Sequence, residues 1–226
     1  MLRIINGINL INDVFKYDVI LVPMSINNYM SKGFKYEVAL NFPYVKEKQN
    51  ESSYGDIRKY GTINPIDCNG IIFCLCYMYT TPCYRNGCCS DYVKYDALER
   101  CLTSIAEKFD GKEIGTPILG ADKFDGNGNK DRILEIFENC FKESYVTVYD
   151  YEQRDYVKDM FVEIATLHGR FKRKEMNIED YIAERSKIEW RRRYGIFSKM
   201  PEDYKYIPRK GEIRKGNYIQ LDPQVE

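Results

Sequence analysis

Two loops of this sequence carry the residue types with which proteins bind phosphate groups. One of them is GADKFDGNGN at residues 120–129. Its glycines, Gly120, Gly126 and Gly128, let backbone N–H groups approach an anion closely. A helical pattern begins at residue 130, and the N-terminus of a helix adds a partial positive charge. The pattern predicts a phosphate-binding loop, although ordinary turn chemistry accounts for the same residues.

The other loop, which comes earlier in the chain, is SINNYMSKG at residues 25–33, with Gly33 at the start of another helical pattern. If both loops follow strands of one open α/β sheet, they lie at the same edge and converge on one ligand, for which a diphosphate is the natural chemistry. The alternative is that both are plain strand-to-helix turns without a ligand. Neither loop has a Walker-A pattern, so ATP hydrolysis of the P-loop kind is not supported.

Strands and helices that alternate along the chain must position these loops. The segments YDVILVPM (17–24) and NGIIFCLCYMY (69–79) are continuous apolar runs, typical of central strands covered by helices. The strands expected are 2–5, 17–24, 61–64, 69–79, 112–120 and 144–150, and the helices are 34–42, 91–109 and 130–141. This order predicts an α/β fold over residues 1–150, a mixed sheet with helices on both faces.

The order of these features resembles the macrodomain family, which binds ADP-ribose and in some branches hydrolyses its conjugates. The counterparts of the family's motifs are YDVILVPMSIN (17–27), MSKGFKYEVA (30–39) and TPILGADKFDG (116–126). The resemblance implies a macro-like three-layer α/β/α domain over residues 1–150. It also implies a ligand, which is ADP-ribose, a related nucleotide derivative or an ADP-ribosylated substrate, and it implies no cofactor.

The resemblance also implies a role for single residues of these motifs. Asn27 would lie near the distal ribose of the ligand, residues 30–33 would form the first phosphate loop, and residues 120–122 would line the second. Phe124 could stack on a ring of the ligand, although packing explains a single aromatic residue equally well. The ligand-binding residues expected are Asn9, Asn27, Met30, Ser31, Gly33, Gly120, Ala121 and Phe124.

In the hydrolytic members that this chain resembles, a lysine and an aspartate carry the reaction. The candidates here are Lys32 or Lys35 and Asp122 or Asp125. A lysine amine could attack the anomeric carbon of the ribose, and the aspartate could act as general acid and base. The alternative is that these are solvated surface charges, the commonest role of both residue types.

The sequence departs from the family's pattern at three places. Ser31 replaces a glycine of the first phosphate loop, and Asp122 replaces the last glycine of the second. Asn9 or Asp13 takes the place of an acidic residue that follows the first strand and binds adenine in the family. These changes favour binding, or a nonstandard substrate, over hydrolysis.

The composition argues against a dedicated nucleic-acid binder, a metal site and a secreted or membrane-spanning protein. The 34 basic and 34 acidic residues cancel, whereas a dedicated nucleic-acid binder has a basic excess. The eight cysteines include no CxxC pair, and Cys83, Cys88 and Cys89 cluster in one loop, so we expect free thiols and no metal site. The start of the chain has Asn and Asp where a signal peptide needs an apolar run, and no stretch reaches the length of a membrane span, so we expect a cytoplasmic protein.

Residues 151–226 form a charged, mainly helical extension with 17 basic and 14 acidic residues. Helices are expected near 152–167 and 177–193. The segment KIEWRRRYGIF (187–197) interleaves arginines with aromatic residues, which favours either nucleic-acid binding or docking of its aromatic side on protein.

Two alternatives to the ligand-binding interpretation stay open on the sequence. In the first, the protein is a non-catalytic interaction protein whose C-terminal arginines and aromatic residues contact nucleic acid or a protein partner. In the second, it is an enzyme of a doubly wound fold unrelated to macrodomains. The strand order of the sheet distinguishes the second alternative from the macro-like fold.

Overall fold

The computed structural model describes residues 2–30, 32–79, 93–122, 126–142, 145–151, 156–197 and 199–207. The chain divides into two compact units, Met1–Asp155 and Tyr156–Glu226. We refer to the first as the α/β unit and to the second as the helical hairpin, and each is considered by itself.

The α/β unit is built on one sheet with the strand order β1-β6-β5-β2-β4-β3. Its strands are β1 (Leu2–Asn6), β2 (Val19–Ser25), β3 (Ile63–Cys68), β4 (Ile71–Tyr79), β5 (Ile114–Pro117) and β6 (Val146–Asp150). All neighbouring pairs run parallel except β3, which pairs antiparallel with β4 at one edge. The expected mixed sheet is therefore confirmed.

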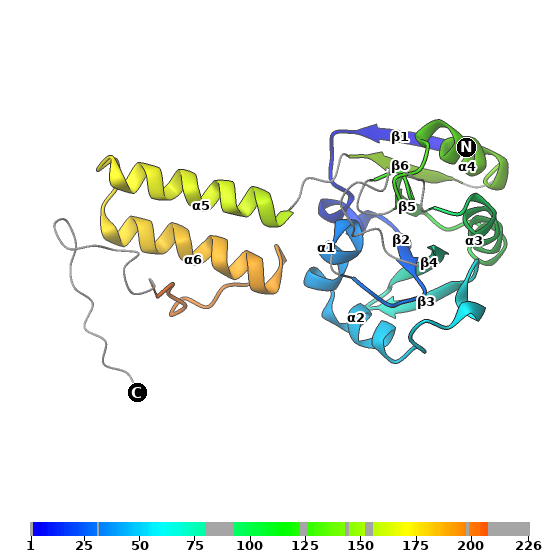
Figure 1. Cartoon of the computed structure of the whole chain (residues 1–226), viewed down its shortest axis with the longest axis horizontal. Helices are drawn as coiled ribbons and strands as arrows, with labels where there is room; N and C mark the ends of the chain where they lie inside the picture. Colours follow the sequence, from blue (N-terminus) through cyan, green and yellow to red (C-terminus); the bar gives the residue numbers. More distant parts are fainter. Residues whose placement is uncertain are drawn as a thin grey trace. The chain divides into compact units, whose positions relative to one another are not determined.

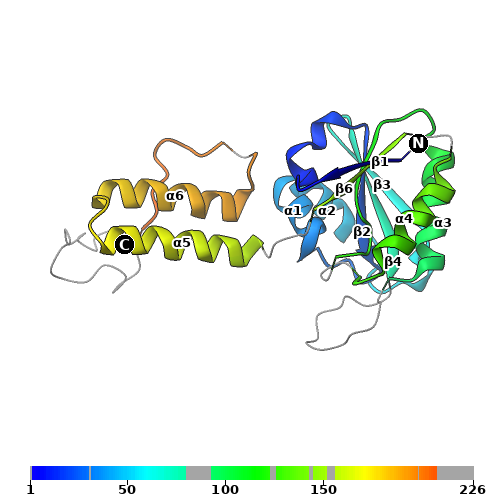
Figure 2. The same cartoon turned by 90° about the horizontal axis from the view of Figure 1, so that it is seen from above.

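Helices cover both faces of this sheet, as Figures 1 and 2 show. Helices α1 (Gly33–Asn41) and α2 (Pro43–Asn50) lie on one face, and α3 (Tyr95–Lys108) and α4 (Lys130–Cys140) lie on the other. Alternate side chains of β2 enter the two hydrophobic cores: Ile20 and Val22 pack on the α1 side, and Val19 and Leu21 on the α3 side. The predicted three-layer α/β/α architecture is confirmed.

Two short connections reverse or redirect the chain of the α/β unit: the junction of α1 with α2, and the turn between β3 and β4. Pro43 ends α1 as expected, but it also begins α2, since its missing N–H costs nothing in the first helical turn. Asn69 (φ 57°) and Gly70 (φ 89°) form the two-residue turn between β3 and β4. Both positive φ angles fit a type I′ hairpin turn, which returns β4 alongside β3.

The helical hairpin consists of α5 (Tyr156–Lys172) and α6 (Ile178–Tyr194). A small core holds the two helices together and includes Leu167, Phe171, Tyr181 and Ile188. Asn177 caps the start of α6 by accepting a hydrogen bond from the backbone N–H of Asp180 at 2.8 Å. Among the described residues, no helix combines the length and the apolar character that crossing a membrane requires.

A chain of hydrogen bonds ties the start of the α/β unit to its sheet. Two short 3₁₀ helices, η1 (Leu10–Asn12) and η2 (Val14–Lys16), follow β1. The Tyr149 hydroxyl on β6 donates to Asp13 Oδ2 at 2.8 Å and lies 2.7 Å from the Tyr17 hydroxyl. The hydrogen bond and charge of Lys16, with the hydroxyl of Tyr149, lower the pKa of Asp13. Asp13 therefore stabilises the fold in its charged form.

We expect the Asp13→Asn variant to lose stability in a pH-dependent way. A carboxyl whose folded pKa lies below its unfolded value of 3.8 adds stability above that pH and loses it as the pH falls through the folded value. The difference in unfolding free energy between wild type and variant, measured with urea, should therefore be largest near neutral pH and shrink below about pH 4. A difference that stays constant from pH 7 to pH 3 would contradict this role.

Candidate functional site

The carboxyl ends of the parallel strands β2, β4 and β5 lie at one edge of the sheet. The loop that joins β2 to α1 leaves this edge, and so does the loop that joins β5 to α4. Ligands of open α/β sheets bind outside this edge. The structure thus brings together the two loops that the sequence singled out.

The last residues of the loop from β2 to α1 include a buried side chain, Met30, and an exposed one, Lys32. Met30 is buried and packs into the core beneath α1, so it shapes the loop from below. Lys32 is exposed, has an extended backbone and makes no side-chain hydrogen bond to cap α1. Gly33 begins α1 at φ 65°, a left-handed conformation that glycine adopts without strain. The first turn of α1, with its partial positive charge, thus follows a glycine at the edge of the sheet.

Asn27 and Asn28 are neighbours in this loop, but their side chains differ in their hydrogen bonds. Asn28 lies at φ 60°, and its amide Nδ2 donates to the carbonyl oxygens of Ser52 at 2.9 Å and Gln49 at 3.4 Å. The side-chain amide of Asn27 makes no hydrogen bond within the described part of the chain, and its Oδ1 lies next to Gly55. Asn27 is half-buried, so it has a donor and an acceptor to offer a ligand.

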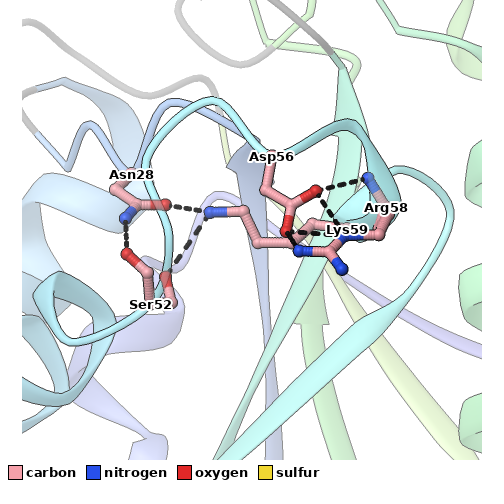
Figure 3. Close-up of polar contacts among 5 residues, drawn as sticks. All are labelled: Asn28, Ser52, Asp56, Arg58 and Lys59. Atoms are coloured by element: carbon pink, nitrogen blue, oxygen red, sulfur yellow. Dashed lines mark hydrogen bonds and ion pairs between the residues drawn. The ribbon is translucent and has the colours of Figure 1, made fainter.

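Asn28 belongs to a network that sequence reasoning missed (Figure 3). Its Oδ1 accepts from Gln49 Nε2 at 2.8 Å and from Lys59 Nζ, in the 3₁₀ helix η3 (Ile57–Lys59). Lys59 also lies 3.4 Å from Ser52 Oγ, and burial lowers the pKa of its ammonium. Gln49 is fully buried, and its Oε1 accepts from the Tyr77 hydroxyl at 2.7 Å. We call Asn28, Gln49, Ser52, Lys59 and Tyr77 the loop brace.

The two candidate lysines occupy different surroundings. Lys32 is exposed, whereas Lys35 is only 1% exposed. The Lys35 ammonium donates to the Tyr79 hydroxyl at 2.8 Å and lies 5.3 Å from the centre of that ring. Tyr79 is the last residue of β4, and its hydroxyl donates to the Pro23 carbonyl at 3.4 Å. The structure therefore places Lys35 inside the unit, beside the carboxyl end of a central strand.

Asn9 and its alternative, Asp13, both make contacts within the protein. The Asn9 side chain accepts from the backbone N–H of Ile11 at 3.1 Å, which caps η1. Its amide also donates to Glu37 on α1 at 2.8 Å. Glu37 is only 6% exposed, so α1 brings a buried carboxylate to the end of β1. No sequence signal pointed to Glu37, because the acid was expected after β1 rather than on α1.

The loop from β5 to α4 is closed on itself by its backbone. The N–H of Gly128 donates to the carbonyl of Gly120 at 2.7 Å, and the N–H of Asn127 donates to the carbonyl of Asp122 at 2.9 Å. A Cβ at Gly120 would lie 2.6 Å from Val93 and 2.8 Å from Met78. A Cβ at Gly128 would lie 2.4 Å from Val93. The two glycines therefore let the loop pack closely against core side chains, which the sequence pattern did not reveal.

The start of α4 makes three polar contacts with side chains of its own unit. Asn129 caps it by accepting from the backbone N–H of Arg132 at 2.9 Å. The Asn129 N–H donates to the Tyr95 hydroxyl at 3.0 Å, and Lys130 forms an ion pair with Asp150. One backbone N–H of the first turn of α4, that of Arg132, thus already has a side-chain partner. Residues 121–122, near the start of this loop, are half-buried.

Several residues named in the sequence analysis lie outside the described residues. They are Ser31, Asp125, Phe124, and the cysteine cluster of Cys83, Cys88 and Cys89. Among the described residues, no group of three or more His, Cys, Asp or Glu side chains could hold a metal ion. Burial raises the pKa of the Cys101 thiol to about 12, so this cysteine is a core residue rather than a nucleophile.

In the helical hairpin, acidic neighbours engage two of the three consecutive arginines of α6. Arg191 pairs with Glu163 on α5 at 3.0 Å, and Arg192 pairs with Glu189 at 2.8 Å. Trp190 stacks within its own unit, with its ring 4.1 Å from that of Tyr194 and 4.8 Å from that of Tyr204. Two of the three arginines considered for a nucleic-acid interface are thus paired with acidic side chains of their own unit.

Several solved structures have the fold of the α/β unit. The macrodomain of Thermus aquaticus DarG is 14% identical, with a TM-score of 0.52, and covers 66% of this chain and 98% of its own. A macrodomain protein from Streptomyces coelicolor is 15% identical, with a TM-score of 0.50 and coverages of 67% and 99%. A Bacteroides thetaiotaomicron protein of unknown function is 18% identical, with a TM-score of 0.53 and coverages of 66% and 98%. The sequence matches no protein-family model and no curated protein.

We expect the Gly120→Ala variant to be less stable than the matched variant Gly111→Ala. Both glycines have positive φ, 82° and 72°, but a Cβ at Gly111 meets no atom within 4 Å. The backbone strain alone should cost Gly111→Ala about 1 kcal/mol. The added overlap with Val93 and Met78 should raise the loss for Gly120→Ala to about 2–4 kcal/mol, measured by urea unfolding. Equal losses would show that the loop does not depend on this close packing.

Proposed function

We propose, from the divergent macrodomain fold of the α/β unit, that this unit binds ADP-ribose or a closely related nucleotide derivative. The observation that carries the proposal is the side-chain amide of Asn27. It makes no hydrogen bond in the described part of the chain, yet it stands at the edge where β2, β4 and β5 end. A half-buried amide in that position is suited to the hydroxyl groups of a ribose.

The diphosphate would lie beside the start of α1. Gly33 begins α1 at the positive end of the helix dipole, and the exposed Lys32 would add a full positive charge beside the ligand. Residues 120–122 would face this loop from the β5 side of the site. The ligand would thus interact with two backbone segments and one side-chain amide.

Hydrolysis of an ADP-ribosyl linkage is a second candidate function, and Lys35 is the observation that favours it. Its amine lies 2.8 Å from the Tyr79 hydroxyl at the end of β4. In this reaction the nitrogen of Lys35 would form a bond to the anomeric carbon while the bond to the leaving group breaks. Asp122 would first accept a proton from the Lys35 ammonium, which frees the amine for attack, and would then give that proton to the leaving group. Water would later release the ribose from the lysine.

Calorimetric titration tests the binding function. We expect wild type to bind ADP-ribose with micromolar affinity and ADP, which lacks the distal ribose, more weakly. Asn27→Ala should weaken ADP-ribose binding by about 1 kcal/mol, the size of one hydrogen bond, and leave ADP binding unchanged. The matched control is Asn41→Ala, since Asn41 lies at the end of α1 and its amide donates to the Glu37 carbonyl one turn earlier in the same helix. Absence of heat with ADP-ribose would contradict the proposed function.

Hydrolysis is tested with the Lys35→Met variant, which keeps the length of the buried chain and removes the amine. We expect it to bind ADP-ribose like wild type and to release no ADP-ribose from an aryl ADP-ribose glycoside that wild type cleaves. Lys48→Met is the matched control, because Lys48 on α2 pairs with Glu51 and lies outside the proposed site. Cleavage that survives in Lys35→Met would exclude this lysine as the nucleophile.

A further inference from the structure

The loop brace joins the β2–α1 loop to three segments that are distant in sequence. Asn28 is 21 residues from Gln49, 24 from Ser52 and 31 from Lys59. Figure 3 shows the Lys59 side chain reaching toward Asn28 and Ser52, while Asp56 binds Arg58 on the other side. Tyr77 fixes Gln49 to β4 from within the core. The brace therefore connects the loop both to α2 and to the sheet.

The brace also completes the end of a helix. The last carbonyl groups of an α-helix have no partner inside the helix. At the end of α2, the Asn28 amide donates to the carbonyl oxygens of Gln49 and Ser52, and the Ser52 hydroxyl donates to the Gln49 carbonyl at 2.7 Å. The positive charge of Lys59 stands at this negative end of the helix. The Asn28 side chain is thus held by the carbonyl groups at the end of α2 and by the ammonium of Lys59.

Holding Asn28 restricts its neighbour. Asn28 has a positive φ, uncommon for a residue other than glycine, and its side-chain bonds offset that cost. The Gly55 N–H donates to the Ile26 carbonyl at 2.9 Å, which fixes the loop on the other side of Asn27. Asn27 lies between these two fixed points, so its backbone is held on both sides of the residue.

We propose that Asn28 and Lys59 are positioning residues that hold the Asn27 amide in the orientation in which it binds the distal ribose of the ligand. The inference rests on the proposed ADP-ribose binding. It attributes the preference for ADP-ribose over ADP in part to the loop brace, whose residues do not themselves contact the ligand. A residue held in its binding orientation binds without first losing conformational freedom, so weakening the brace lowers affinity.

The test compares ADP-ribose with ADP in calorimetric titrations of three variants. Asn28→Gly removes the side chain but keeps the positive φ without strain. Lys59→Met removes the ammonium, and Lys48→Met is the matched control, because Lys48 is an exposed lysine of α2 paired with Glu51. We expect ADP-ribose binding to weaken about fourfold in Asn28→Gly and about twofold in Lys59→Met, less than the roughly fivefold loss expected when the Asn27 amide itself is removed. ADP binding, and both affinities of Lys48→Met, should stay unchanged.

A double-mutant cycle separates positioning from general loss of structure. In the Asn27→Ala background, Asn28→Gly and Lys59→Met should weaken ADP-ribose binding no further, because the amide that they position is gone. Equal weakening of ADP and ADP-ribose, or additive losses in the double variants, would overturn the inference. These outcomes would leave the proposed function intact, since wild type would still bind ADP-ribose.

Hydrogen–deuterium exchange of the ligand-free protein tests the brace even if wild type binds neither nucleotide, the outcome that contradicts the proposed function. Peptides covering residues 26–30 and 52–56 should exchange faster in Asn28→Gly and Lys59→Met than in wild type and in Lys48→Met. Unchanged exchange in both variants would overturn the inference, whatever the ligand.

Discussion

The hydrogen bonds of β2 to β4 on one side and to β5 on the other hold both candidate loops at one edge of the sheet. All seven residues of β2 are buried, so the strand is fixed by packing on both faces as well as by its ladders. The ends of these strands cannot move apart without opening both hydrophobic cores. The central strands therefore determine where the two loops of the site begin, and contacts within the loops determine only their local conformation.

The elements with strong apolar patterns could be predicted from the sequence, because burial on one or both faces leaves a periodic trace. This holds for β2, β4, α3 and α4. The turn at Asn69 and Gly70 carried a recognisable signal of its own, since that dipeptide favours a tight hairpin, but the strand before it was expected to be only four residues long. Pro65 within β3 masked the pattern, and it is tolerated because β3 is an edge strand.

The candidate site could be predicted only in part. Loop positions follow from strand order, and Asn27 was identified through the family's motif. Lys59 and Glu37 were not, because each acts through a partner 28 or more residues away, and no local pattern records such a contact. The glycines of the second loop were expected to face a phosphate, and their close contacts with Val93 and Met78 depend on packing that the sequence does not show. The arginines of α6 likewise looked available until the structure placed Glu163 and Glu189 beside two of them.

The central claim is that ADP-ribose binds between the two loops and meets the amide of Asn27. A titration of the ¹⁵N-labelled protein with ADP-ribose, followed by NMR, tests it most directly. The account predicts that the side-chain amide of Asn27 and the backbone amide of Gly33 shift first and furthest, whereas the amides of α5 and α6 do not shift. Shifts confined to the helical hairpin, or no shifts at millimolar ADP-ribose, would contradict it.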